Sequence, residues 1–221
     1  MFARIFPRPS QSAELIQLFS LLSQGEKIAH RSAIVQAQQM NTCGRRSQAK
    51  FLRTQARHEL FHSKVFDSTV LFLGGKTNTT KFHCLNRYAS YLEKSLNSGA
   101  IIESLLATQV VLENLGKLAL QGIDGRMEQQ GKGLEKIRSV ILAQEDEHHH
   151  FGQSELLSLM QDEGVQIDTV RQLTQLYAEL AFDILDEVAP LFDALDSDNE
   201  RFKHNLLNEM PAWLNIDLAS S

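Results

Sequence analysis

Two Glu-x-x-His motifs stand out in this sequence because acid–imidazole pairs with that spacing can bind a metal ion. They are Glu59 with His62 and Glu145 with His148. On a helix, residues three positions apart project from the same face, so each pair can converge on one point. One such pair is weak evidence in a chain with 8 histidines. The repetition of the motif is the more informative observation.

A further glutamate lies at nearly the same distance upstream of each motif. Glu26 precedes Glu59 by 33 residues, and Glu113 precedes Glu145 by 32. At about 1.5 Å rise per residue, this separation returns an antiparallel helix pair to the same height. Four carboxylates and two imidazoles in a four-helix core are the ligand set of di-iron and di-manganese proteins. The predicted metal ligands, which would also form the catalytic centre, are Glu26, Glu59, His62, Glu113, Glu145 and His148.

Helices must position these residues, and the sequence has a helical pattern almost throughout. Apolar residues recur with a period near ~3.6, and no proline lies between Pro9 and Pro190. We expect helices over about 12–40, 48–72, 81–96, 100–121 and 127–162, a fifth long helix from 168, and a short segment reaching 213. Thr79 or Thr80 is expected to cap the helix at 81–96, and Asp168 the fifth long helix.

Each predicted ligand lies in the apolar stripe of its helix. On the first helix, for example, Leu22, Glu26 and Ala29 share one face. Burying unpaired carboxylates there would be costly. Lys117 and Arg138 lie on the stripes of the third and fourth ligand helices, but two cations cannot readily balance four carboxylates. A pair of divalent metal ions is the better explanation.

The segment EDEHHH, residues 145–150, contains two Glu-x-x-His pairs, and helical phase indicates which of them faces the core. At about 100° per residue, Glu145 and His148 fall in the apolar stripe, whereas Glu147 and His150 face away. We expect that second pair to lie in solvent. His149 is closer to the stripe and is a candidate to contact a ligand side chain and hold its orientation. The remaining histidines without a partner carboxylate are interpreted as surface or core residues: His30, His58, His83 and His204.

Composition restricts the class of protein. The chain has 221 residues, of which 43% are hydrophobic, and its formal net charge of −5 argues against a duplex-binding surface. We find no apolar run long enough for a membrane span or a secretory signal. Cys43 and Cys84 form no CxxC pair, so a zinc ribbon or rubredoxin-type iron site is not expected. The expected compartment is the cytoplasm.

Three short segments resemble the ferritin-like di-iron carboxylate superfamily. QGEKIA around Glu26 resembles the GExxA start of rubrerythrins and of cyanobacterial aldehyde-deformylating oxygenases. EDEHHHFG, which ends at Gly152, resembles the ExxHxxFG segment shared by those oxygenases and by relatives of the ribonucleotide reductase small subunit. HELFHSKVF, which contains Glu59 and His62, is similar to their first ExxH helix. The resemblance covers residues 12–161 in architecture.

The resemblance implies an all-α fold. Residues 1–163 would form a ferritin-like four-helix bundle with a short crossover helix, and residues 164–221 a helical extension packed on it. Two iron ions would be bound, with Mn/Fe and Mn/Mn as alternatives. Glu59 and Glu145 would bridge the ions, Glu26 and Glu113 would be terminal or bridging ligands, and His62 and His148 would each hold one ion.

The sequence departs from the family pattern at several positions. Many members place Asp before the fourth-helix glutamate, where it orients a ligand histidine. This chain has Gln144 there, so either Gln144 or His149 could take that role. Without a rubredoxin-like site, electrons would come from an external donor, ferredoxin-like or similar. The three tyrosines lie outside the ligand helices, so a stable tyrosyl radical is not expected.

The pattern and the resemblance together predict an enzyme, a non-haem di-iron oxidoreductase that uses O2 to oxidise a small hydrophobic substrate. Fatty-aldehyde-deformylating oxygenases are the nearest analogy. One alternative is a rubrerythrin- or ferritin-like peroxide reductase or ferroxidase without an organic substrate. Another is a helical interaction protein whose acid–histidine set is vestigial or structural. An elongated cavity reaching the metals would favour the oxygenase. The sequence does not specify the substrate, the electron donor or the metal. It does not specify the oligomeric state either, for which a homodimer is one option.

Overall fold

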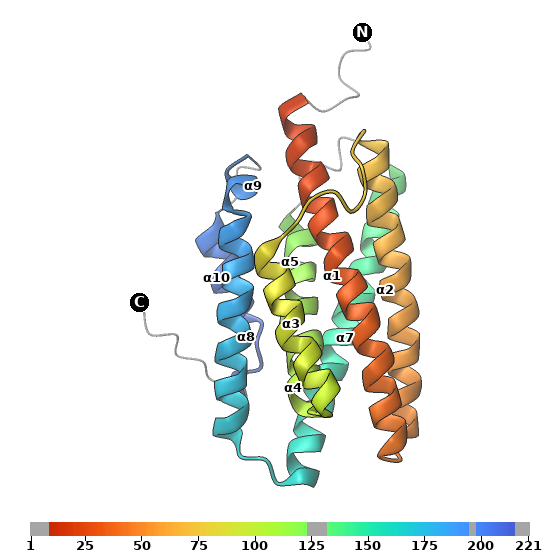
Figure 1. The fold of residues 1–221 in the computed structure, drawn as a ribbon, viewed down its shortest axis with the longest axis vertical. Coiled ribbons are helices and arrows are strands. Elements are labelled where there is room, and N and C mark those ends of the chain that lie inside the picture. The colour runs from red at the N-terminus through yellow and green to blue at the C-terminus, as the bar shows by residue number, and fades with distance from the viewer. Residues whose placement is uncertain (1–8, 123–131, 195–197, 215–221) are drawn as a thin grey trace.

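The computed structural model describes residues 9–122, 132–194 and 198–214, and its regular structure there is entirely helical (Figure 1). The predicted all-α fold is confirmed. The α-helices are α1 (Pro9–Thr42), α2 (Arg46–Phe72), α3 (His83–Ser98), α4 (Ile101–Leu105), α5 (Glu113–Gly122), α7 (Lys132–Glu163), α8 (Ile167–Glu187), α9 (Ala189–Ala194) and α10 (Asn199–Asn208). A π-helix, η1 (Leu106–Leu112), and a 3-10 helix, η3 (Ala212–Leu214), complete the described part.

A bundle of four elements forms the centre of the molecule. Its members are α1, α2, α7 and the composite helix α4–η1–α5 (Figure 1). α1 and α2 lie side by side as an antiparallel hairpin, and α8 and α10 lie on the opposite edge. Gly44 adopts a φ of 78° in the turn between α1 and α2. Glycine tolerates this left-handed conformation, so the chain reverses within three residues of the end of α1.

The helix expected over 100–121 is interrupted by the π-helix. A π-helix bonds each amide to a carbonyl five residues earlier, so it leaves carbonyl groups that need other donors. Tyr88 of α3 donates its hydroxyl to the carbonyl of Ala107 at 2.6 Å, and Nδ1 of His149 lies 3.0 Å from the carbonyl oxygen of Gln109. Both neighbouring helices therefore stabilise the irregular segment, which single-sequence periodicity cannot reveal.

Close packing of α7 against η1 depends on one glycine. A Cβ atom built on Gly152 would lie 2.3 Å from Cβ of Gln109 and 3.5 Å from its Cα. The first distance is far shorter than a normal contact, so a larger residue would push the π-helix away from α7. Because Glu113 follows η1 directly, this contact also fixes the height of Glu113 in the bundle.

The predicted capping residues are wrong for two helices. α3 begins at His83 rather than after Thr79 or Thr80, and the amides of His83 and Cys84 donate to the carboxylate of Glu187 at 2.7 and 2.8 Å. A carboxylate from α8 thus performs the capping role that sequence proximity assigned to a threonine. α8 begins at Ile167, so Asp168 lies in its first turn instead of capping it.

The helices after residue 163 share their core with the bundle. Tyr177 and Ile184 of α8 belong to the same buried apolar cluster as Leu22 of α1 and Leu115 of α5. The rings of Tyr88 and Tyr177 meet edge to face with centroids 5.4 Å apart. α7 runs to Glu163, and the first residues expected for it, 127–131, lie outside the described residues. Within the described part, no helix is long and apolar enough to span a membrane.

Candidate metal centre

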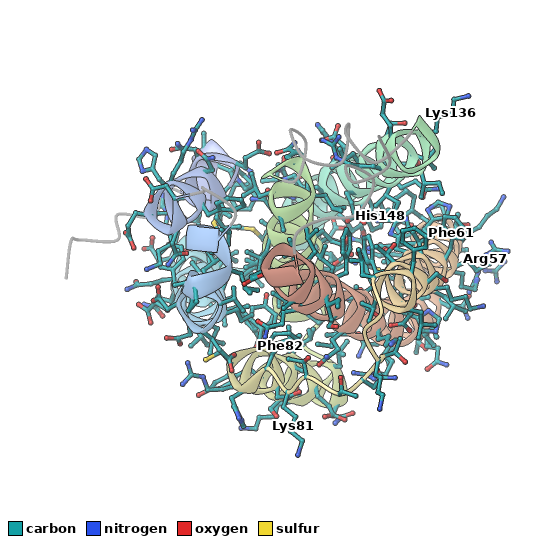
Figure 2. All side chains as sticks on the ribbon, turned by 90° about the horizontal axis from the view of Figure 1, so that it is seen from above. Arg57, Phe61, Lys81, Phe82, Lys136 and His148 are labelled. Carbon is teal, nitrogen blue, oxygen red and sulfur yellow. The ribbon has the colours of Figure 1, made fainter. Side chains whose placement is uncertain are left out.

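The six predicted ligands meet in the centre of the bundle. They form two overlapping groups, in each of which the potential ligand atoms lie within 4.8 Å of one another. The first group contains Glu26, Glu59, His62 and Glu145, and the second contains Glu59, Glu113, Glu145 and His148. All six side chains are buried, and Figure 2 shows His148 between α2 and the interior. Glu59 and Glu145 belong to both groups, as expected for residues that bridge two ions.

The first half of the cluster surrounds His62. Its Nδ1 lies 3.1 Å from Oε2 of Glu59, 3.0 Å from Oε1 of Glu145 and 3.5 Å from Oε2 of Glu26. The other ring nitrogen, Nε2, donates to Oε1 of Gln144 at 2.8 Å. This bond places the proton on Nε2 and leaves Nδ1 able to bind a metal. Gln144 therefore takes the orienting position that the sequence left open.

The second half of the cluster surrounds His148. Its Nδ1 lies 2.9 Å from Oε1 of Glu59 and 3.8 Å from Oε2 of Glu113. Its Nε2 lies 3.2 Å from Nδ1 of His58, and the two rings are stacked with centroids 5.4 Å apart. His58, interpreted from the sequence as a surface or core residue, is half-buried and stacks on a predicted ligand. It directly precedes Glu59, and examining both neighbours of the ligand motif on the helix would have suggested it.

A chain of buried amides supports Glu113. Nε2 of Gln55 donates to Oε1 of Glu113 at 2.8 Å. Gln109 of the π-helix donates to Gln55 at 3.3 Å and to Gln36 of α1 at 2.9 Å. Gln36 donates in turn to Thr108 at 3.3 Å. Sequence reasoning missed this network, although Gln55 shares the inward face of Glu59, and a glutamine in an apolar stripe is a usable signal.

Several inward-facing atoms of the cluster lie close to one another as ion-pair partners but make no hydrogen bond of good geometry to a described residue. They are both carboxylate oxygens of Glu59, Oε1 of Glu145, Nδ1 of His62 and Nδ1 of His148. An unsatisfied buried polar atom costs about 1–3 kcal/mol, and more when charged. These five atoms face one another, with oxygen and imidazole donors that suit iron, manganese or zinc. The residues therefore fit a divalent metal site, although neither the metal nor the number of ions follows from this geometry.

The electrostatics of the cluster show how strongly its groups interact. Burial raises the pKa of Glu26 to about 8 and raises the pKa of Glu145 well above its usual value. Burial also acts on Glu59, but the two histidines outweigh it and lower its pKa to about 2. Burial lowers the pKa of His148, yet the neighbouring carboxylates raise it to about 10. Protons thus occupy the cluster at neutral pH, and a metal would have to displace them.

The side chains that could compete for these carboxylates have other partners. Nζ of Lys117 lies 2.9 Å from both Asp146 and Glu209. Arg138 donates from Nε to the carbonyl of Leu120 at 3.0 Å. Lys117 therefore does not neutralise the cluster, which agrees with the argument for metal ions.

The predicted orientation of the two Glu-x-x-His pairs of α7 is confirmed. Glu147 and His150 are exposed, as expected, while Glu145 and His148 are buried. His149 is also buried, but its ring contacts the carbonyl oxygens of Gln109 and Glu209 and the side chain of Gln153. It therefore supports the π-helix rather than a predicted ligand.

An apolar pocket reaches the cluster from the side of α8. Its cavity volume is about 60 Å³, and residues of α1, α3, η1, α5, α7, α8 and α9 wall it, with Val188 between the last two helices. Among its lining residues, Glu26, Glu113 and Glu145 are the polar ones, and the others are apolar side chains or glycine. The remaining wall includes Leu22, Leu115, Ile184 and Phe192. A small apolar group could therefore lie directly against three carboxylates of the candidate centre.

A second, polar pocket opens on the other flank, between α2 and α7. Its lining includes Lys50, Phe51, His58, Glu147 and His148. Here a predicted ligand histidine and its stacked neighbour face a hollow that contains charged and hydroxyl groups. Both histidines are buried, but His148 lines this hollow and His62 does not.

The comparisons with known proteins give no family for this chain. No protein-family model matches it, and no curated protein matches it. Support for a function therefore comes from the geometry of the six residues and from the pockets beside them.

Proposed function

We propose that the protein is an oxygen-activating di-iron oxidoreductase that acts on a hydrophobic organic substrate, in the manner of aldehyde-deformylating oxygenases. The observation that carries the proposal is the apolar pocket whose wall contains Glu26, Glu113 and Glu145. A protein that only oxidises or stores iron has no need for such a pocket next to its ligands. The resemblance of the ligand motifs to those of ferritin-like proteins supports the same reading.

In this proposal, the chain holds one ion near His62 and Glu26 and the other near His148 and Glu113. Glu59 and Glu145 lie within reach of both positions. Bound iron would supply the electrons that reduce dioxygen and the oxidant that acts on the substrate.

The surrounding residues have defined tasks. Gln144 orients the ring of His62 and Gln55 orients the carboxylate of Glu113. The apolar wall excludes water and binds substrate by burying its hydrocarbon, at about 0.8 kcal/mol per methylene group. Because the lining contains no lysine or arginine, it favours a substrate without an anionic group in the pocket.

A second candidate function is a peroxide reductase or ferroxidase without an organic substrate. The polar pocket beside His58 and His148 favours it, because hydrated iron or peroxide could reach the cluster there. This candidate uses the same six residues but leaves the apolar pocket without a role.

Iron loading followed by oxygen consumption tests the proposal. The protein is loaded anaerobically with Fe²⁺, its iron content is measured, and O2 uptake is followed with and without short- and medium-chain aldehydes. Ala119→Phe narrows the apolar pocket, while Ala143→Phe places the same ring on the exposed face of α7. We expect substrate-dependent O2 uptake in the wild type and Ala143→Phe, and its loss in Ala119→Phe at full iron content.

The two candidates give different results. Rapid turnover of iron or peroxide would favour the ferroxidase or peroxide reductase if neither an added aldehyde nor Ala119→Phe changed its rate. A wild-type protein that takes up no iron would contradict both.

A further inference from the structure

The outward face of α2 carries a row of five cations. Arg46, Lys50, Arg53, Arg57 and Lys64 are spaced by four, three, four and seven residues, so they follow one line along the helix. All five are exposed. The row covers about 27 Å at about 1.5 Å per residue. It occurs in a protein whose formal net charge is −5.

The basic row lacks the acidic partners that other cations of the protein have. None of its five residues forms an ion pair with a described carboxylate, whereas Lys27, Arg45, Arg87, Lys117, Arg171 and Lys203 do. The acids of α2 lie elsewhere: Glu59 is buried, and Asp67 pairs with Lys27. Like charges three or four residues apart destabilise a helix by about 0.2–0.5 kcal/mol per pair. An anionic partner would offset this repulsion between like charges.

The position of the basic row separates it from the substrate pocket. Figure 2 shows Arg57 and Phe61 on the outer side of α2, His148 inward of them, and α8 to α10 on the far side of the molecule. The apolar pocket is walled by α8 and the α8–α9 segment, whereas the polar pocket beside the basic row includes Lys50, His58 and His148. A partner on α2 would therefore approach the His148 half without covering the substrate entrance.

Aromatic side chains connect this surface to the cluster. Phe61 is 49% exposed and provides an apolar contact within the basic row. His58 lines the polar pocket and stacks on His148. Phe51, also in that pocket, meets His148 edge to face with centroids 6.2 Å apart. Lys50 is therefore the residue of the basic row that lines the same pocket as His58 and His148.

We infer that this face of α2, around Arg53, Arg57 and Phe61, is the docking surface for an acidic one-electron carrier protein, which delivers electrons through the His58–His148 pair. The inference rests on the proposed di-iron function, which needs an external reductant. Each encounter oxidises the carrier by one electron and reduces the metal centre by one electron, and the carrier then dissociates. Charge complementarity between an acidic carrier and the basic row would steer their encounter.

Other anionic partners fit the surface less well. An acidic carrier that presents substrate would need to dock near the apolar pocket, on the other side of the molecule. A nucleic acid or an anionic membrane could bind the cations, but neither explains the adjoining pocket that reaches His148.

Charge reversal tests the surface. Arg53→Glu/Arg57→Glu alters the basic row, and Lys94→Glu/Arg201→Glu makes the same change in net charge at exposed positions of α3 and α10. The probe is an acidic plant-type [2Fe–2S] ferredoxin, titrated in its oxidised form against metal-free protein at about 20 mM and about 200 mM salt. We expect wild-type binding that weakens with salt, a loss of about tenfold or more in the α2 variant, and a change of about twofold or less in the control.

Electron transfer gives the second readout. The rate of reduction of the iron-loaded protein by reduced ferredoxin should fall about tenfold or more in the α2 variant, while reduction by dithionite stays unchanged. Equal ferredoxin binding by both variants, or no binding by the wild type, would overturn the inference. The inference would also be overturned if the α2 variant lost affinity only for tRNA or anionic vesicles and not for ferredoxin. Because the titration uses metal-free protein, a failure of iron loading would contradict the proposed function and leave the docking result readable.

Discussion

The two halves of the candidate centre have nearly the same sequence motif but different surroundings. Each combines an upstream glutamate with a Glu-x-x-His pair. His62 is fully buried, and its second nitrogen donates to the neutral amide of Gln144. His148 instead contacts the half-buried His58 beside a polar pocket. The repeated motif places the ligands, whereas the neighbours that differ decide which half borders a polar pocket.

This difference suggests a division of labour. The apolar pocket is lined by Glu26 of the His62 half, Glu113 of the His148 half and the shared Glu145, while His148 itself lies toward α2 beside the polar pocket. In the proposed enzyme, substrate would approach from the α8 side and electrons from the α2 side. The predictions below test whether the halves are unequal in this sense.

Removing a residue that both halves share should have the largest effect. Glu59→Ala deletes a carboxylate within reach of both histidines, so we expect metal uptake to be abolished. Helix content by circular dichroism should stay nearly intact, because the apolar core is unchanged. Glu163→Ala, an exposed acid at the end of α7, serves as the control and should bind metal normally. Full metal occupancy in Glu59→Ala would show that the cluster does not hold the metal.

Removing a single histidine should separate the halves. His148→Ala is expected to empty its own half and to leave residual affinity near His62, whereas His62→Ala should do the reverse. Metal titration followed by spectroscopy would detect binding to one remaining position. Identical loss in both variants would indicate that the two positions cannot be filled separately.

Changing the residues behind the histidines should have a smaller and unequal effect. Loss of such a partner typically lowers metal affinity about 10- to 100-fold. We expect Gln144→Leu to reach the upper part of that range, since His62 is buried and no solvent can replace the amide. His58→Phe should cost less, because water in the polar pocket can accept from His148. Competition against a metal chelator measures both, and the opposite order would contradict the assignment of the polar pocket to the His148 half.

The pH dependence of stability should differ between the metal-free and metal-loaded forms. The pKa of Glu26 is raised to about 8 and that of His148 to about 10, so the folded metal-free protein holds protons that the unfolded chain releases at lower pH. Their contribution to stability is complete at low pH and is lost as the pH rises toward 8 and then 10. Metal binding displaces those protons, so affinity should increase over the same window.

Thermal unfolding at pH 6, 7 and 8 checks this prediction. The metal-free protein should lose stability as the pH rises, and the stabilisation caused by added metal should grow. A metal effect that is independent of pH would mean that the cluster carries no exchangeable protons.

The smallest predicted effect concerns the π-helix that precedes Glu113. Gly152→Ala forces its Cβ toward Gln109 and should reduce the free energy of unfolding by about 1–3 kcal/mol. Because Gln109 bonds to Gln55, which holds Glu113, the His148 half should weaken more than the His62 half. Gly116→Ala, where an added Cβ meets nothing within 4 Å, is the matched control and should be neutral or stabilising. Denaturant unfolding measures both variants.

Sequence patterns predicted the parts of this molecule that depend on helical periodicity. The inward face of α7 follows from its apolar residues, and the near-equal spacing from Glu26 to Glu59 and from Glu113 to Glu145 anticipated their meeting. Both depend on repeats within one helix or one hairpin, which a single sequence displays directly.

The features that were missed depend on contacts between helices distant in sequence. His58 gains a role only because α7 places His148 against it, and the cap of α3 is Glu187, 104 residues beyond His83. The π-helix likewise depends on Tyr88 and His149 from neighbouring helices. Local propensity contains no information about such partners, so these features needed the folded structure.

Anomalous diffraction at the iron edge, from crystals of protein loaded anaerobically with Fe²⁺, tests the central claim most directly. The account predicts two iron positions inside the bundle, one bound by Nδ1 of His62 and the other by Nδ1 of His148, with Glu59 and Glu145 shared between them. Iron found only at surface carboxylates, or no ordered iron among these residues, would contradict it.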